Sequence, residues 1–279
     1  MKLRYEVEKE MMVKEYLVYL GISHHLRKKV RSLDNIYING IHSKNYYMLK
    51  KGDILELEFP EELNDEYEAN FKDLDLIKIL YEDDYLMIIS KPVDIASQVT
   101  RKHSLDNVLS IVKAYYINNN IKSNIHLVNR LDYSTSGLMI IAKSNICHNE
   151  LTKINIDKYY LCLVHGHLKE KELLIEANIK REDPPSILRY IDKDGQVAKT
   201  IVKEIKRIDD KSLVEAKLIT GRCHQIRLHL SSIGNPIIGD KLYGKCEDER
   251  LCLHAYHLKF NHPFTNEIID IYDYPDFMC

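Results

Sequence analysis

Asp132 and Arg222 are the two residues of this sequence whose types and surroundings most clearly suggest chemistry. Asp132 lies in a polar segment, residues 129–137, and the apolar run 138–142 that follows predicts a buried strand. Polar loops carried on rigid strands often hold functional side chains. A carboxylate that is partly removed from water drifts toward its neutral form unless a cation stays close, and only the ionised form is a nucleophile. We therefore expect Arg222 to hold Asp132 ionised.

The small residues after Asp132 could shape the same loop. Thr135 and Ser136 carry short hydroxyls that can hydrogen-bond to loop backbone, and Gly137 permits a tight turn or the close approach of a ligand. Each of these residues also has an ordinary interpretation, because a loop aspartate is commonly a turn former or a solvated charge. The chemical interpretation therefore depends on what accompanies the loop.

Several further segments, taken in order, resemble the RluA-type family of RNA pseudouridine synthases. The resemblance covers roughly residues 76–275 and rests on motifs that agree in order and spacing. These motifs are Ser-Lys-Pro at 90–92, Arg-Leu-Asp-x-x-Thr-Ser-Gly at 130–137, Lys-Tyr-Tyr at 158–160, Thr-Gly-Arg-Cys-His-Gln-Ile-Arg at 220–227, Gly-Asn-Pro-Ile-Ile-Gly-Asp at 234–240, Leu-His-Ala at 253–255 and Phe-Asn-His-Pro at 260–263.

The resemblance implies an enzyme that converts uridine in RNA to its carbon-linked isomer. Asp132 would attack the nucleoside and detach the base, which then rotates and reattaches through carbon five. Tyr160 would stack near the base and help to remove the proton from carbon five. Arg222 would be the ion-pair partner of Asp132, the role that electrostatics also assigns to it. Without the family, Tyr160 in its apolar strand would be assigned to core packing.

The resemblance also implies residues that hold the RNA. An enzyme of this kind must extrude its target nucleotide, and Arg130 would be the wedge whose flat guanidinium stacks where the base had been. The ordinary alternative is a surface arginine that touches phosphate. The full set of implied substrate-binding residues is Arg130, Thr135, Ser136, Lys91 and Leu253.

An amphipathic helix is predicted over residues 222–233, because Ile226, Leu230 and Ile233 have helical spacing. Arg222 would then lie at its N-terminal end, where the helix dipole opposes a cation and favours its use for a carboxylate or phosphate. We expect the polar residues of this helix to form a solvated face or to contact phosphate, with Arg227 as an RNA-binding residue. These polar residues are His224, Gln225, Arg227 and His229.

Two positions depart from the family pattern. Many relatives have His where this chain has Asn129, and glycine is common where this chain has Asp94. Neither position is a proposed catalytic one, so we expect activity to be retained and substrate preference to be affected.

Length and composition are those of an ordinary globular protein. The chain has 279 residues, 45% of them apolar and 29% charged, and few Gly or Pro residues. We predict an RNA-binding module over 1–60, a charged linker over 61–75 and a catalytic domain over 76–279. The fold class is α+β, a mixed and largely antiparallel sheet with a central RNA-binding cleft, preceded by a small α/β module.

The N-terminal region carries a basic cluster, although the net charge of the whole chain is only −2. Residues 13–59 read as two helices followed by short strands, and they resemble the αL RNA-binding module of some ribosomal proteins and tyrosyl-tRNA synthetases. A solvated helix face is the alternative interpretation. The basic residues assigned to RNA binding are Arg27, Lys28, Lys29 and Arg31.

Six scattered cysteines and the absence of an apolar leader or spanning segment favour a cytoplasmic protein. The one metal-like pattern is Cys246, Cys252, His254 and His257, and we expect no metal there because a strand would point its members to opposite faces. No nucleotide or dinucleotide fingerprint is present, so no cofactor is expected. We also expect no membrane partner, and a monomer.

The leading hypothesis is therefore an RNA pseudouridine synthase acting on structured RNA, with large-subunit ribosomal RNA favoured over transfer RNA by the appended module. The alternative is a non-catalytic RNA-binding or ribosome-assembly factor built on the same scaffold. A hydrolase that uses Asp132 as nucleophile is a third hypothesis, which the lack of a dedicated water-activating base disfavours.

Overall fold

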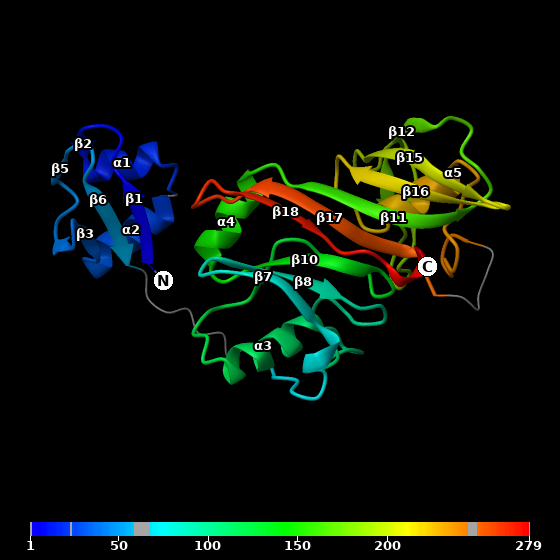
Figure 1. Cartoon of the computed structure of the whole chain (residues 1–279), viewed down its shortest axis with the longest axis horizontal. Helices are drawn as coiled ribbons and strands as arrows, with labels where there is room; N and C mark the ends of the chain where they lie inside the picture. The colour runs from blue at the N-terminus through cyan, green and yellow to red at the C-terminus, as the bar shows by residue number, and fades with distance from the viewer. Residues whose placement is uncertain (1, 23, 59–66, 245–249, 279) are drawn as a thin grey trace. The chain divides into compact units, whose positions relative to one another are not determined.

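The computed structural model describes residues 2–22, 24–58, 67–244 and 250–278 of the chain. The chain divides into two compact units, Met1–Leu63 and Asn64–Cys279 (Figure 1). Residues 61–66 of the predicted linker lie outside the described residues. Its described part, 67–75, packs on the second unit: Asn70 donates its backbone N–H to Ser110, and Tyr67 and Leu74 lie against the second unit's core.

The first unit is a four-stranded antiparallel sheet, in the order β1-β6-β3-β4, accompanied by two helices. The predicted turn joins β3 to β4, and Asn39 and Gly40 both have positive φ there, as a two-residue hairpin requires. Leu55 and Leu57 are fully buried on one face of β6, as their alternation predicts. Its elements are β1 (Lys2–Glu6), β2 (Met11–Met12), α1 (Val13–Tyr19), α2 (His24–Leu33), β3 (Ile36–Ile38), β4 (Ile41–His42), β5 (Met48–Leu49) and β6 (Ile54–Glu58).

The second unit is built on a ten-stranded sheet with the central order β12-β15-β16-β11-β17-β10-β8-β7. Strand β18 pairs with β17, and β9 pairs with β10. In the described part of this sheet the pairing is antiparallel, except that β10 runs parallel to β17. The fold is therefore α+β with a mixed, largely antiparallel sheet, as predicted.

The strand predicted over 138–142 lies within β10, and the helix predicted over 222–233 appears as the shorter α5, whereas α4, which follows the N-cap Ser144, was not predicted. The elements up to β11 are η1 (Leu74–Leu76), β7 (Lys78–Glu82), β8 (Leu86–Lys91), α3 (Val108–Asn118), β9 (His126–Leu127), β10 (Ser136–Ala142), α4 (Asn145–Lys153) and β11 (Asp157–His165). The remaining elements are β12 (Glu172–Glu176), β13 (Ile179–Arg181), β14 (Arg189–Ile191), β15 (Lys199–Ile208), β16 (Lys211–Leu218), α5 (Gln225–Ser232), β17 (Leu253–Asn261), β18 (Ile268–Tyr272) and η2 (Asp276–Met278).

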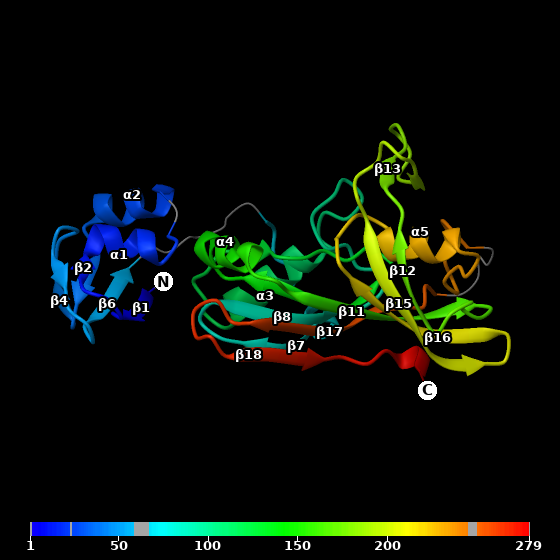
Figure 2. The ribbon, with the colours of Figure 1, turned by 90° about the horizontal axis from the view of Figure 1, so that it is seen from above.

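One face of the large sheet forms the main core together with α3 and α5 (Figure 2). Successive side chains of a strand point to opposite faces, and β11 shows this alternation: Tyr160 and Cys162 join the main core, whereas Tyr159 and Leu161 join a second cluster on the other face. The pairing of β11 with β17 shifts register between Tyr159 and Tyr160. A bulge of this kind re-aims neighbouring side chains.

Gly137 determines how the strand after the Asp132 loop meets its neighbour. It pairs with Ala255 in the parallel contact between β10 and β17. Its φ is +111°, and a Cβ atom there would lie 2.3 Å from the Ala255 carbonyl oxygen. Glycine is therefore required at this position by the neighbouring backbone of β17, and not by the approach of a ligand, because only glycine fits both the conformation and the space.

Within the described residues, no helix combines the length and the apolar character needed to span a membrane.

Candidate active site

A cavity of about 890 Å³ in the second unit gathers many of the residues singled out in the sequence. Its lining includes Arg130, Asp132, Thr135, Tyr160, Arg222, Arg227 and Leu253. Segments far apart in the sequence therefore meet at one place. Lys91 and Ser136, which were also assigned to substrate binding, do not line this cavity.

The Asp132 side chain is 26% exposed, on a loop whose backbone is fixed from several sides. The Ser97 hydroxyl donates to the Leu131 carbonyl oxygen at 2.6 Å and accepts from the Leu131 N–H at 3.1 Å. The Lys91 ammonium donates to the carbonyl oxygen of Tyr133 at 3.1 Å. Both neighbours of Asp132 are thus held, and the carboxylate is presented to the cavity from a fixed position.

Arg227 is the arginine that pairs with Asp132. Its Nη1 lies 3.6 Å from Oδ2 of Asp132. On its other side Arg227 donates two hydrogen bonds to Asp240, from Nε at 2.9 Å and from Nη2 at 2.6 Å. This bidentate pair fixes the plane of the guanidinium. Asp240 therefore orients the cation that faces Asp132.

The prediction that Arg222 pairs with Asp132 is wrong. The Arg222 Nε donates to the carbonyl oxygen of Val197 at 3.1 Å, and the residue is exposed at the cavity wall. The physical reason is that the helix begins later than predicted, at Gln225, after His224 adopts a left-handed conformation with φ of +56°. That turn places Arg227 in the first helical turn, on the face directed into the protein.

The predicted solvated face of this helix is also wrong. Gln225 is 3% exposed and His229 is fully buried. The Gln225 amide donates to Thr200 Oγ1 at 2.9 Å, and the two ring nitrogens of His229 contact Thr200 Oγ1 and the Ala177 carbonyl oxygen, both at 3.0 Å. Arg227, predicted to bind RNA, is 5% exposed and engaged by two carboxylates. These polar side chains join α5 to neighbouring segments instead of facing solvent.

Lys91 and Ser136 are structural groups in this protein, which corrects their assignment to substrate binding. Lys91 is fully buried, and its ammonium also donates to the carbonyl oxygens of Pro92 and Ile95. Burial lowers the pKa of Lys91 to about 7, while the nearby carboxylates oppose that shift. The Ser136 hydroxyl lies 2.8 Å from Nδ1 of His254 and is buried. Both groups therefore already have partners within the protein.

Tyr160 and Leu253 lie where a base could be received. Both line the cavity, and both are almost completely buried as residues. Burial raises the pKa of Tyr160 well above its ordinary value, and the Asp132 charge acts in the same direction. The phenol is therefore neutral at physiological pH. A neutral phenol ring can stack on a base. Because its pKa is raised, it releases its hydroxyl proton only while it accepts another proton.

Lys158 is a cavity residue that the sequence analysis quoted within a motif but gave no role. It lines the same cavity, and desolvation lowers its pKa. Lys158 precedes Tyr160 by two residues in the same strand, so both side chains lie on the same face of that strand. This spacing of two was visible in the sequence and could have identified Lys158. Lys158 is therefore a cationic group directed toward the cavity together with Tyr160.

Arg130 and Thr135 both line the cavity, but the first is exposed and the second is buried. Arg130 is exposed and donates from Nη1 to the Gln98 side chain at 3.3 Å. The Thr135 hydroxyl is buried, and within the described part of the chain it has no hydrogen-bond partner. An unpaired buried hydroxyl at a cavity wall is suited to a polar group of a bound molecule.

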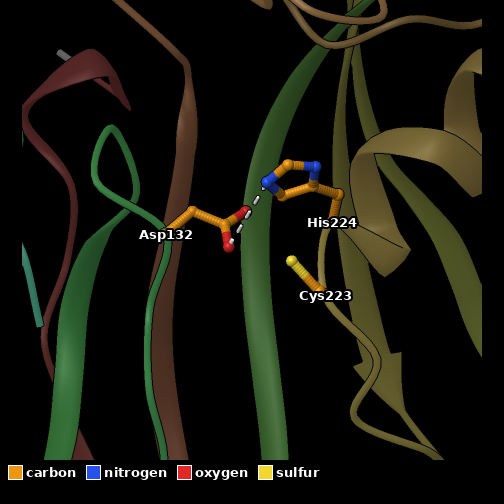
Figure 3. Close-up of side chains that lie close together, drawn as sticks. All are labelled: Asp132, Cys223 and His224. Carbon is orange, nitrogen blue, oxygen red and sulfur yellow. Dashed lines mark ion pairs between the residues drawn. The ribbon is translucent and has the colours of Figure 1, made fainter. Parts of the chain in front are cut away.

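His224 and Cys223 precede α5 and also line the cavity. The His224 Nε2 lies 4.0 Å from Oδ1 of Asp132 (Figure 3). Its Nδ1 lies 2.9 Å from the hydroxyl of Tyr243. Burial lowers the pKa of His224, whereas the Asp132 carboxylate raises it. The three donor atoms of Asp132, Cys223 and His224 lie within 4.8 Å of one another. This cluster was not anticipated, because its members come from two distant segments.

The metal-like pattern noted in the sequence does not form a shared site among its described members. His254 bonds to Ser136 and to the Asp273 carbonyl oxygen, while His257 pairs with Asp270 at 2.8 Å. Cys252 is a buried core residue, and Cys246 lies outside the described residues.

In the first unit, basic side chains surround a separate cavity of about 520 Å³. Arg27, Lys28 and Arg31 line it, together with Lys14 and His24. The side chain of Lys29, also assigned to RNA binding, lies outside the described residues. The grouping provides several positive charges around one concave surface.

Comparison with known proteins identifies the family. The family described as RNA pseudouridylate synthase matches residues 85–232. An uncharacterized RNA pseudouridine synthase of Bacillus subtilis, YjbO, is 37% identical over 265 residues, covering 92% of this chain and 93% of the relative. The ribosomal large subunit pseudouridine synthase C of Buchnera aphidicola is 30% identical over 298 residues, covering 93% of this chain and 91% of the relative.

A solved structure agrees at the level of fold. Human RNA pseudouridylate synthase domain containing 1 superposes with a TM-score of 0.61 and 22% identity, covering 75% of this chain and 87% of the human chain. Sequence and fold thus agree with the motifs that meet around Asp132. The chain belongs to the RluA-type family of RNA pseudouridine synthases and is an enzyme of that family.

Proposed function

We propose that this enzyme isomerises specific uridines to pseudouridine in structured RNA, with Asp132 as the nucleophile and large-subunit ribosomal RNA as the substrate. The observation that carries the proposal is the Asp132 carboxylate, presented to a large cavity on a braced loop and faced by the buried Arg227 at 3.6 Å. An adjacent fixed guanidinium favours the ionised, nucleophilic form of a carboxylate.

In this proposal Asp132 attacks the nucleoside, and the bond between N1 of the base and C1′ of the ribose breaks. The base rotates within the cavity, and a bond forms between C5 and C1′ as the bond between the Asp132 oxygen and C1′ breaks, which regenerates the free carboxylate. The proton on C5 leaves, and N1 takes one up, so atoms balance without a redox partner. The neutral phenol of Tyr160 stacks on the ring and relays the C5 proton, accepting one proton as it gives another.

Two other cavity residues are given roles in the same proposal. Arg130, exposed at the cavity, occupies the space left by the extruded base. The Thr135 hydroxyl, buried without a partner among the described residues, hydrogen-bonds to the base or ribose. Arg222 lies exposed at the wall and contacts the RNA backbone, a role that replaces its predicted pairing with Asp132.

The proposed ribosomal substrate rests on two observations. One relative is named a ribosomal large subunit pseudouridine synthase, and the first unit groups Arg27, Lys28 and Arg31 around a concave surface. Clustered positive charge is the electrostatic requirement for phosphate binding. We propose that residues 1–60 act as an αL-type RNA-binding module.

The test uses RNA that carries tritium at C5 of uridine. We expect the purified protein to release tritium from large-subunit ribosomal RNA, and the Asp132→Asn variant to lose release by more than about a thousandfold, since the amide is not a nucleophile. The variant should keep its RNA affinity because it is nearly isosteric. Equal release by the variant would eliminate the proposed nucleophile, and no release by the unmodified protein from any RNA pool would favour the binding-factor alternative.

A further inference from the structure

The cavity wall brings a carboxylate, a thiol and an imidazole together. Asp132 comes from the loop before β10, and Cys223 and His224 come from the turn before α5. Their donor atoms lie within 4.8 Å of one another, and Figure 3 shows the three side chains directed toward a common space. Thiolate, imidazole and carboxylate are the three ligand types that zinc uses in proteins.

The orientation of His224 suits a metal ligand. Its Nδ1 lies 2.9 Å from the Tyr243 hydroxyl, which leaves Nε2 directed at Asp132. When Nδ1 donates its proton to the Tyr243 oxygen, Nε2 presents its lone pair to the common space. A hydrogen bond to the other ring nitrogen is the usual way in which proteins fix a histidine ligand.

The local charge also accommodates a cation. Arg227 is the nearest guanidinium to Asp132, but it is shared with Asp240, which holds it through two hydrogen bonds. Two carboxylates thus face this guanidinium, and deprotonation of the Cys223 thiol on metal binding would add a further negative charge.

Access and spacing are compatible with binding. Cys223 is exposed, and the cavity that it lines is open to solvent. With zinc–ligand bonds of about 2.0–2.3 Å, the donor atoms of a tetrahedral site lie roughly 3.3–3.8 Å apart. The Nε2 to Oδ1 separation of 4.0 Å between His224 and Asp132 is already close to that range. Small side-chain rotations would complete the site.

We propose that Asp132, Cys223 and His224 form an inhibitory binding site for a thiophilic divalent cation, with Zn²⁺ as the representative ion. The Cys223 thiol releases its proton to solvent, and the ion binds the thiolate, the His224 Nε2 and one Asp132 oxygen, with water in the fourth position. Coordination draws electron density from the carboxylate, which makes it a weaker nucleophile, and the ion occupies part of the cavity that the nucleoside must enter. This inhibitory consequence rests on the proposed function of Asp132, whereas the binding itself does not.

The binding test uses Co²⁺, because a tetrahedral cobalt–thiolate site absorbs visible and near-ultraviolet light. We expect the full chain, freed of metal by a chelator, to develop a thiolate-to-cobalt band that saturates at one ion per chain and disappears when Zn²⁺ is added. Cys223→Ser should abolish the band, and His224→Gln should weaken binding by more than about tenfold, since even changes outside the first ligand shell cost that much. Cys252→Ala, which removes a buried core thiol, is the matched control and should keep the band.

The inhibition test measures tritium release as Zn²⁺ is added, with each protein compared with its own metal-free rate. We expect the concentration for half-inhibition to rise by more than about tenfold in Cys223→Ser and His224→Gln. A thiolate band that persists in Cys223→Ser, or no band in the unmodified protein, would overturn the site. Equal inhibition of both variants and the unmodified protein would overturn the inhibitory role. A protein that binds Co²⁺ as expected but releases no tritium without metal would instead disprove the proposed function.

Discussion

Helices α2 and α5 both carry basic side chains, but these side chains have opposite environments. In α2, Lys28 and Arg31 are exposed around the cavity of the first unit. In α5, Arg227 and His229 are buried and fully engaged by protein groups. A positive residue can therefore serve as a contact for an external anion or as an internal support for a reactive carboxylate. Burial decides between the two roles, because a buried charge must be paired.

Among changes in these two helices, the largest effect on stability and activity is expected from Arg227→Met. The variant leaves Asp240 buried without its bidentate partner, which should cost about 3–5 kcal/mol of unfolding free energy. It also removes the cation beside Asp132, so tritium release should fall by at least about a hundredfold, roughly 2.7 kcal/mol. Denaturant titration and the release assay measure the two effects.

Arg222→Met is the matched control for that prediction, since it removes an arginine exposed at the wall of the same cavity. Its unfolding free energy should change by less than about 0.5 kcal/mol. If the Arg222 variant lost more stability than the Arg227 variant, the contrast between paired and exposed arginines would be mistaken.

A smaller effect is expected from the buried histidine of α5. Burial lowers the pKa of His229 in the folded protein below its value of about 6.5 in the unfolded chain. At a pH between these two pKa values, the unfolded chain therefore binds a proton at this residue that the folded chain does not. Stability contributed by neutral His229 is therefore present above about pH 6.5 and is lost as the pH falls, by at most about 1.4 kcal/mol per pH unit. His229→Gln should make the unfolding free energy less dependent on pH between 7.5 and 5.5.

Denaturant titrations at both pH values measure this change, and Lys193→Gln, at an exposed position, is the control. An unaltered pH dependence in the His229 variant would show that this imidazole is not the group that titrates.

The smallest effect on stability is expected in α2. Replacing Lys28 and Arg31 together by Gln should leave the unfolding free energy within about 0.5 kcal/mol of the original. RNA affinity should fall, and the plot of log affinity against log salt concentration should become less steep by about 0.7–0.9 per lost phosphate contact.

A filter-binding series over several salt concentrations tests this prediction. The control removes the same charge from β15, through Lys203→Gln and Lys206→Gln at exposed positions. Equal losses of affinity in both pairs of variants would mean that only total charge matters and that α2 has no special part in binding.

The local pattern was sufficient to predict many elements because their burial repeats with a simple period. The run 138–142 lies within β10, all of whose residues are buried. The alternation at Leu55 and Leu57 likewise lies within β6. Helix α4 escaped prediction because its apolar residues are few and its hydrophobic face is short. Burial periodicity depends only on residues that are close together in the chain, so the linear sequence is sufficient to predict it.

The motifs of the linear sequence were enough to identify the family, the loop that carries Asp132 and the strand that supports it. Which arginine faces that carboxylate became clear from the folded structure. A single left-handed residue, His224, delays the start of α5 and turns Arg227 inward while Arg222 stays at the wall. The linear pattern contains both arginines but not the direction of either side chain, because that direction depends on one backbone angle and on Asp240 arriving from another segment. The cluster of Asp132, Cys223 and His224 follows from the same turn.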